Sequence, residues 1–496
     1  MKNNSRLLGL LGLLFLLLVD SAHANTWNAG TASWFVAGNW SAPAAVPAAT
    51  DPALINNGGT AQVSTPGAVT STLRAGSGGP GTVTLSGTGQ LTTSLETWIG
   101  EDATGTLNVS GAPALFVSAG EGHVGAFGTG TLNIGAGSSA SFLDAVYFGE
   151  IASALGTANV AGAAAILTTT GMIVGDEGRG ALNISAGGTI NSNLATILGY
   201  HAAGWGTIQL TGAGSTLNVG SDLRAGVEGQ AGIAVNDLAV IDLSGHTIVL
   251  AENAGSTAEL IIGAMNTPAG RVIANAIFGA AGTATVVFAH STIGYDLSPP
   301  ILGTARVLHT GTGSTHFVEA NSYSGGTLIS NGTLTAAHAD ALGVGPVENK
   351  ARLSLEANLS LSSTYVQGAT GTLDTAFIAP SCMPSSISVA EAVTLAGALS
   401  LRFPACTPTV GQSYLIVSTS ASLSGTFAGL PEGATFLSGG QRFRVHYTPN
   451  AVSVTCLGAD ALGAGEPIPT LSQVGIAILS VLLTLGALIA LRRRVV

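Results

Sequence analysis

The chain of 496 residues contains 70 glycines, while only 8 % of its residues are charged and 5 % are aromatic. So few charges argue against a compact helical enzyme, and 46 % hydrophobic residues argue against a disordered chain. The net charge of −11 at pH 7 argues against nucleic acid and anionic lipid as partners, because no basic patch is available to neutralise phosphates.

The N-terminal residues have the parts of a secretory signal peptide. Two basic residues precede an apolar run at 7–19, and Ala22 and Ala24 frame an A-x-A cleavage site. The apolar run is too short to span the hydrocarbon core of a bilayer. We therefore predict that residues 1–24 are removed and that the mature chain begins at Asn25, outside the cytoplasm.

Residues 25–70 form a Trp-rich segment. The stretch "NTWNAGTASWFVAGNW" and the strand-like "DPALINN" that follows it resemble the opening of many exported β-helical proteins. In that resemblance Trp27, Trp34 and Trp40 cover the open end of a solenoid, which needs a cap because a free edge would template another strand. A carbohydrate-stacking cluster is the alternative interpretation of the same residues.

Residues 71–300 contain a repeat. The anchors GTVTL, GTLNV, GTLNI, GTANV, GALNI and GTIQL begin at positions 81, 105, 130, 156, 180 and 206, which are 24 to 26 residues apart. An apolar residue followed by glycine, as in Ile99-Gly100 and Val124-Gly125, keeps the same period. Apolar and polar residues alternate within each unit, as in strands. The pattern predicts an all-β fold, a right-handed parallel β-helix with coils of about 25 residues.

An asparagine recurs in the first anchor, at 108, 133, 159 and 183. Stacking of the coils could join these side chains into an amide ladder, or they could point outward as solvated neighbours of the turns. We favour the second interpretation.

Acidic residues follow the second anchor glycine in several coils. Coil stacking places such residues along one edge at about 5 Å spacing. The favoured interpretation is a solvated edge that keeps the solenoid soluble. Calcium binding and an acid pair, as in pectin-degrading β-helix enzymes, are the alternatives. The residues concerned, which we call the acidic edge, are Glu101, Asp102, Glu150, Asp176 and Glu177.

Common catalytic motifs are absent from the sequence. It contains no G-x-S-x-G, no H-E-x-x-H and no P-loop. We therefore predict that the protein is not an enzyme and has no catalytic residue, metal or cofactor.

Residues 301–390 carry a second motif. The stretch "NSYSGGTLISNGTL", with Tyr323, Gly325, Gly326 and Thr327, resembles the autotransporter-associated β-strand repeat. The resemblance implies a β-helical passenger segment on a bacterial surface. Residues 391–456 resemble the closing strands of such proteins.

Three cysteines remain in the mature chain: Cys382, Cys406 and Cys456. Three pairings are open in an oxidising compartment, and we favour Cys382 with Cys406 because this pair closes a short loop.

A linker at 457–467 leads into a tail at 468–496. The tail contains a short motif, an apolar stretch at 474–491 that is about 27 Å long as a helix, and an arginine cluster. Such a helix just spans a bilayer core, and the arginines place its end in the cytoplasm. The motif and the cluster are Ile468, Pro469, Thr470, Leu471, Ser472, Arg492, Arg493 and Arg494.

This tail resembles the IPTL-CTERM sorting signal of certain Gram-negative bacteria. The resemblance implies that a membrane-embedded enzyme reads the motif and that the helix is a temporary tether. A permanent membrane anchor is the alternative.

Together these features predict an exported, tail-sorted β-helical protein with a structural or adhesive role at the cell surface or outside the cell. The alternative is a protein that binds or cleaves polysaccharide. The expected partners are the inner membrane, at least transiently, the secretion machinery, and a sorting protease or transpeptidase. Surface glycans or matrix are further partners in this interpretation, and nucleic acid is not.

Overall fold

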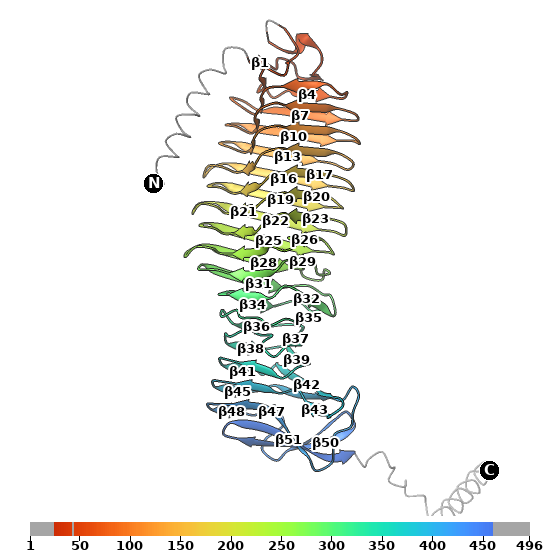
Figure 1. Cartoon of the computed structure of the whole chain (residues 1–496), viewed down its shortest axis with the longest axis vertical. Helices are drawn as coiled ribbons and strands as arrows, with labels where there is room; N and C mark the ends of the chain where they lie inside the picture. The colour runs from red at the N-terminus through yellow and green to blue at the C-terminus, as the bar shows by residue number, and fades with distance from the viewer. Residues whose placement is uncertain (1–23, 42–43, 460–496) are drawn as a thin grey trace, which may run out of the picture.

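The structure, a computed structural model, describes residues 24–41 and 44–459, which form an all-β parallel solenoid of about 15 turns. The chain winds from one end of an elongated body to the other, as the colour from red to blue shows (Figure 1). This confirms the all-β parallel β-helix that the repeats predict. The predicted helix at 474–491 lies outside the described residues.

One side of the solenoid is a 12-stranded parallel sheet. Its strands are β1 (Asn25–Thr26), β3 (Ala53–Ile55), β6 (Leu73–Ala75), β9 (Thr97–Ile99), β12 (Gly122–Val124), β15 (Val146–Phe148), β18 (Met172–Val174), β21 (Thr196–Leu198), β24 (Leu223–Ala225), β27 (Thr247–Leu250), β30 (Ala276–Gly279) and β33 (Ile301–Gly303).

A second side is the long sheet, which runs from end to end of the solenoid. Its strands are β2 (Thr31–Ser33), β4 (Thr60–Val63), β7 (Gly81–Ser86), β10 (Thr104–Ser110), β13 (Thr129–Ile134), β16 (Leu155–Ala161), β19 (Arg179–Ser185), β22 (Trp205–Thr211), β25 (Gln230–Asn236), β28 (Thr257–Ile262), β31 (Thr283–Phe288), β34 (Arg306–His309), β36 (Thr327–Ile329), β38 (Val347–Asn349), β41 (Tyr365–Gln367), β45 (Val393–Leu395) and β48 (Leu423–Gly425).

The third side is a 9-stranded sheet in the N-terminal part and a 7-stranded sheet farther along. The first comprises β5 (Ala68–Thr70), β8 (Gln90–Thr93), β11 (Leu115–Ser118), β14 (Ser139–Phe142), β17 (Ile166–Thr169), β20 (Thr189–Ser192), β23 (Thr216–Val219), β26 (Val240–Asp242) and β29 (Arg271–Ile273). The second comprises β32 (Tyr295–Leu297), β35 (Ser314–Phe317), β37 (Thr333–Ala336), β39 (Arg352–Leu355), β42 (Thr372–Ile378), β43 (Met383–Pro384) and β46 (Ala398–Arg402).

Coils stack in register, so that equivalent residues of the repeat lie side by side. Leu107 of β10 pairs with Leu132 of β13, and both side chains are fully buried. Thr106, the residue before Leu107, points outward, as the period-2 alternation of a strand requires. The inward Leu, Ile and Val side chains of all coils form one continuous core.

Glycine is required at both repeat anchors. Gly100 has a φ of +76°, a left-handed conformation, and a Cβ there would collide with the backbone carbonyl of Thr129 in the next coil. A Cβ on Gly105 would collide with the backbone of Ala75 and Gly100. The two anchors therefore mark corners where coils approach too closely for any side chain.

The coils shorten in the region that contains the "NSYSGGT" motif. Asn321 accepts a hydrogen bond from the backbone N–H of Ile301 and donates one to the carbonyl of Ala341, and each partner is 20 residues away. Tyr323 is fully buried, and its hydroxyl lies 2.6 Å from Thr327 Oγ1. The motif therefore closes a shorter coil, and the long sheet continues through it without a break.

Three tryptophans close the N-terminal end. Trp27 and Trp34 are fully buried and both contact Trp40 edge to face, with ring centroids 5.0 and 4.7 Å apart. The indole N–H of Trp40 donates to the carbonyl of Trp34. Because the rings bury one another, they offer no exposed ring face to a sugar.

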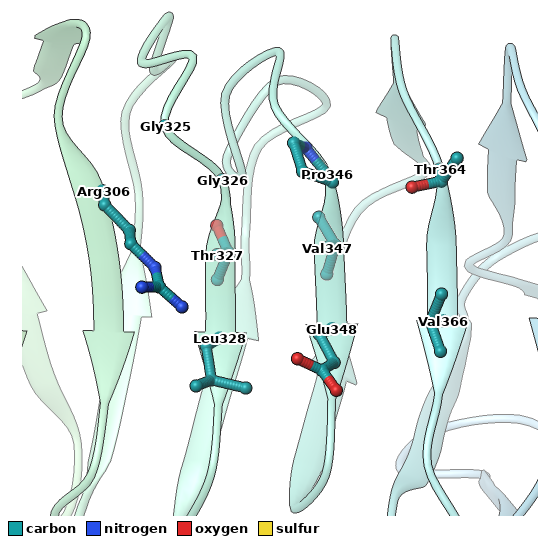
Figure 2. A pocket seen from close by; sticks show the side chains of 10 residues that line it. All are labelled: Arg306, Gly325, Gly326, Thr327, Leu328, Pro346, Val347, Glu348, Thr364 and Val366. Carbon is teal, nitrogen blue, oxygen red and sulfur yellow. The ribbon is translucent and has the colours of Figure 1, made fainter.

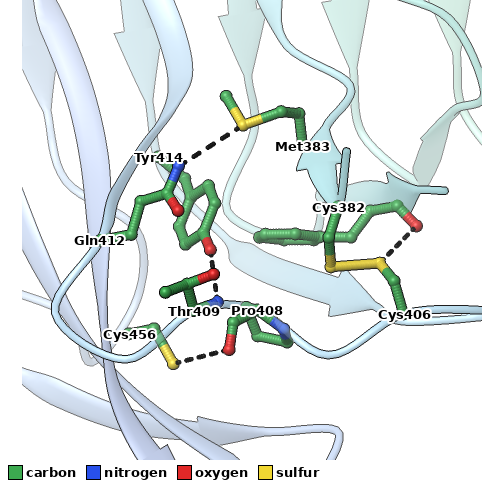
Figure 3. The surroundings of a disulfide bond; sticks show 9 residues. Cys382, Met383, Cys406, Pro408, Thr409, Gln412, Tyr414 and Cys456 are labelled. Carbon is green, nitrogen blue, oxygen red and sulfur yellow. Dashed lines mark hydrogen bonds between the residues drawn. A yellow bond between two sulfur atoms is a disulfide. The ribbon is translucent and has the colours of Figure 1, made fainter. Parts of the chain in front are cut away.

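The C-terminal end is closed by a 6-stranded sheet that turns antiparallel. The structure joins Cys382 to Cys406, with Cα atoms 5.6 Å apart, while the thiol of Cys456 is buried (Figure 3). Residues 457–459, placed in the linker from the sequence, belong to the last strand. The strands are β40 (Leu359–Leu361), β44 (Ile387–Val389), β47 (Ser413–Thr419), β49 (Thr435–Ser438), β50 (Gln441–Thr448) and β51 (Ala451–Ala459).

Candidate functional site

The predicted processing sites lie at the two ends of the chain. Of the signal cleavage residues, Ala24 is described and Ala22 is not, and the whole sorting tail, 468–496, lies outside the described residues. In the part of the chain that the structure describes, no helix is long and apolar enough to cross a membrane.

The outward face of the 12-stranded sheet carries a stack of aromatic rings. The rings of Trp98 and His123 lie 3.8 Å apart and nearly parallel, and His123 stacks on Tyr147 at 5.6 Å. The guanidinium of Arg74 covers the other face of Trp98, 5.5 Å from its centroid. We call Trp98, His123 and Tyr147 the ring ladder. Both ring faces of Trp98 and His123 are covered in this way, and the stacking stabilises the pairing of neighbouring strands.

The residues of the acidic edge come together at one border of this sheet, but they are held by basic partners from adjacent coils. Glu101 Oε1 lies 2.6 Å from Arg74, Glu150 Oε1 lies 2.7 Å from His123 Nδ1, and Asp176 Oδ1 lies 2.5 Å from a histidine of the next coil. That histidine is His201. The edge is therefore a series of side-chain contacts between coils, of which Arg74 with Glu101 is an ion pair and the other two join a carboxylate to a histidine.

The other two acidic residues differ from these. A carboxylate oxygen of Asp102 accepts the backbone N–H of Gly78, and Glu177 is half-buried beside Asp176. Among residues 24–41 and 44–459, no three His, Cys, Asp or Glu side chains are grouped as a metal site. Calcium binding at this edge stays an untested alternative to the solvated edge.

A second group of carboxylates lies on the opposite border of the same sheet, and the sequence analysis missed it. Glu121 Oε2 lies 3.8 Å from His123 Nε2, the hydroxyl of Tyr147 donates to Glu121 Oε1 at 3.5 Å, and the indole N–H of Trp98 donates to Glu96. Each glutamate stands two residues before an outward ring, and strand alternation places such residues on one face. This spacing of two residues could have predicted the group from the sequence.

Burial changes the acidity of this face. It raises the pKa of Glu121, and neighbouring Asp144 and Glu96 raise it further against the opposing effect of His123. Burial also raises the pKa of Asp176 above its usual range, and burial with nearby carboxylates raises the pKa of Tyr147 to about 12. Glu121 and Asp176 therefore hold their protons more tightly than free carboxylates do.

A hollow of about 440 Å³ lies on the outward face of the long sheet, over the short coils (Figure 2). Gly325 and Gly326 of the "NSYSGGT" motif line it, and a Cβ at either position would collide with the backbone of a neighbouring coil, at Ala305 or Pro346. Arg306 and Glu348 contribute opposite charges, and Leu328 contributes apolar surface. The hollow is shallow and mixed in character.

The recurring asparagines lie on the outward face of the long sheet, and they form a ladder. Asn133 Nδ2 donates to Asn108 Oδ1, Asn159 donates to Asn133, and Asn183 donates to Asn159, each at 2.8 Å. The expectation of solvated turn neighbours was wrong. Stacking in register brings identical amides within hydrogen-bond distance. Because a primary amide has both donors and acceptors, it can hydrogen-bond to another asparagine. We call these four residues the Asn ladder.

Comparison with known proteins identifies one segment. Residues 466–494 match the model of the IPTL-CTERM motif. The tail is an IPTL-CTERM sorting signal. No curated protein matches the chain. The sorting signal supports an exported, surface-directed protein, and the β-solenoid fits a surface protein.

Proposed function

We propose that the protein is a tail-sorted structural or adhesive β-solenoid, presented at the cell surface or released into an extracellular matrix, and that it acts without catalysis. The observation that carries the proposal is a sorting signal attached to a long rigid body. Each coil contacts mainly its neighbours, so the solenoid extends as a stalk whose sides repeat the same side chains.

In this proposal residues 474–491 hold the chain in the inner membrane while the bulk lies in the periplasm, and a sorting protease or transpeptidase then cuts near Thr470. The arginines Arg492, Arg493 and Arg494 keep the tail end cytoplasmic. Residues 301–390 act as a passenger segment of the autotransporter-associated type. Short coils, closed by Asn321 and Tyr323, support that last assignment.

The test is the intact mass of the protein from its native host, measured separately in membrane and culture fractions. A species that begins at Asn25 and ends near Thr470 is expected. A variant with alanines at Pro469 and Thr470 should accumulate at full tail length in membranes. A wild-type species that runs to Val496 and stays in membranes would show that the tail is a permanent anchor and would refute processing.

The raised pKa values of Glu121 and Asp176 favour one alternative function, cleavage of polysaccharide by a protonated carboxyl group acting as a general acid. A glycan panel tests it. Release of reducing ends or unsaturated sugars by the wild type, lost in Asp176→Asn or in Glu121→Gln, would replace the structural role with an enzymatic one.

A further inference from the structure

The outward face of the long sheet is uncharged over four successive coils. Strands β7, β10, β13 and β16 contain no Asp, Glu, Lys or Arg. Two polar columns run along the solenoid axis there. One is the Asn ladder, and the other, which we call the Thr column, comprises Thr82, Thr106, Thr131 and Thr157.

A groove of about 400 Å³ follows the Asn ladder across the coils. We call it the Asn groove. Asparagine amides line it, and Ser110, Gly135 and Ala161 leave it open because their side chains are small or absent. The volume lies in the range of natural small-ligand sites, and the groove crosses strands rather than following one.

The amides of the ladder keep hydrogen-bonding capacity. Asn133 uses one N–H toward Asn108 and accepts one N–H from Asn159. A primary amide has two N–H groups and two lone pairs on its oxygen, so one donor and one acceptor per coil remain for a ligand. These groups repeat with the strand spacing of about 4.8 Å.

This chemistry restricts the ligand. A nucleic acid or another polyanion needs cations, and the groove has none. An extended peptide repeats its same-side groups every 6.6 Å or so, which does not match the coil spacing. An uncharged chain with hydroxyl groups on every unit needs no cations, and its hydroxyls can serve as both donors and acceptors toward the amides.

We therefore propose that the Asn groove binds a neutral linear polysaccharide that lies along the solenoid axis. This inference deepens the proposed adhesive role and rests on it. Hydroxyl groups of successive sugars hydrogen-bond to the free donors and acceptors of Asn108, Asn133 and Asn159, and the Thr column borders the chain on its other side.

The deciding variant is Gly135→Tyr. A Cβ at Gly135 meets its nearest atom, Ser110 Cβ, at 3.5 Å, an ordinary contact, so the ring fills the groove without strain in the backbone. Gly232→Tyr is the matched control. Gly232 faces outward on the same sheet beyond the groove, and its Cβ would lie 3.9 Å from the nearest atom.

The experiment measures retention of the full-length protein on cellulose, chitin, β-1,3-glucan and acidic polygalacturonate. We expect retention on at least one neutral polymer, a drop of about tenfold in Gly135→Tyr, and no change in Gly232→Tyr. Asn133→Ala should weaken retention to a lesser degree. Thermal melts of all variants show whether the fold is kept.

Retention on polygalacturonate alone, no retention on any polymer, or equal retention by Gly135→Tyr and wild type would overturn the inference. The test is independent of sorting. A protein that binds glycan through the groove but keeps its tail in the membrane would refute processing and leave the groove assignment standing.

Discussion

On two faces of the solenoid, the outward side chains of adjacent coils contact one another in different ways. On the 12-stranded sheet, outward positions carry rings and charges, and three acids at its border contact a basic residue one coil away, as Glu150 does with His123. On the long sheet, outward positions over four coils repeat uncharged residues, and Asn133 bonds to copies of itself. Like charges at coil spacing repel, so only the neutral face can repeat without alternation.

The two faces therefore differ in how their surface chemistry repeats along the solenoid. A neutral ladder tolerates indefinite repetition and offers the same groups at every coil, which suits contact with a polymer. A charged face must vary from coil to coil to stay neutral overall, so its chemistry is local. Substitutions at the corner that joins the two faces should have the largest effect.

The corner glycine Gly125 should be the most sensitive position. It has a φ of +70°, and a Cβ there would collide with the carbonyl of Leu155 in the next coil. Gly125→Val combines backbone strain with a steric clash, and we expect a loss of about 4 kcal/mol in the free energy of unfolding, measured with denaturant. Gly232→Val, at an open position, serves as the control. Equal losses in the two variants would contradict the corner argument.

The core of the solenoid contains two buried histidines that should make its stability depend on pH. His290 and His309 are fully buried, and Nε2 of each lies near Thr315 Oγ1, at 2.9 and 3.1 Å. Burial, with His309 nearby, lowers the pKa of His290 to about 4. Burial also lowers the pKa of His309.

The sign of the effect follows from proton uptake. Between pH 6.5 and 4 the unfolded chain binds a proton at His290 that the folded protein does not, so stability falls as the pH falls through that window. The expected loss from this one group is about 3 kcal/mol. Melts of wild type and His290→Gln between pH 7 and pH 4 measure it, and a slope unchanged by the substitution would count against burial of a neutral ring.

The sequence predicts the coil well but not its cross-coil pairs. Two glycine anchors with one period mark both corners, because no other residue fits at Gly100 or Gly105, and the alternation between them identifies the inward face. The partner of Glu150 is 27 residues away, whereas the coils themselves vary in length at the corners. A shift of one residue at a corner changes which side chains meet, so pairs such as Glu150 with His123 become visible only in three dimensions.

For the Asn ladder, the sequence predicts which residues are neighbours but not how their side chains interact. Its register was evident from the sequence, since the four asparagines share one position in the anchor. What the pattern could not supply was the orientation of the amides, because an outward asparagine can face water or its neighbour. The hydrogen-bond distances of 2.8 Å decide between these two arrangements.

A partly buried ion pair should matter more than an exposed one. Side chains of Arg74 and Glu101 are about one-tenth exposed, whereas those of Lys350 and Glu348 are nearly half exposed. Arg74→Met leaves a buried carboxylate without its base, and we expect a loss of about 2 kcal/mol, partly restored by adding Glu101→Gln. Lys350→Met should cost no more than about 0.5 kcal/mol. Denaturant midpoints compare the two, and similar losses would contradict the difference in burial.

The smallest expected effect tests the neutral face itself. Asn133→Ala removes two amide hydrogen bonds of the ladder, and we expect a loss of about 1 kcal/mol, because water replaces part of each bond at a half-buried site. Thr131→Ala, two residues earlier on the same face of β13, should stay within about 0.5 kcal/mol of wild type.

Asn133→Asp distinguishes the loss of a hydrogen bond from the effect of an added charge. The carboxylate still accepts from Asn159 but cannot donate to Asn108, and any neighbouring aspartate would add repulsion. Asn133→Asp combined with Asn159→Asp should therefore destabilise by more than the sum of the single changes, and a strictly additive result would show that repetition on this face does not depend on neutrality.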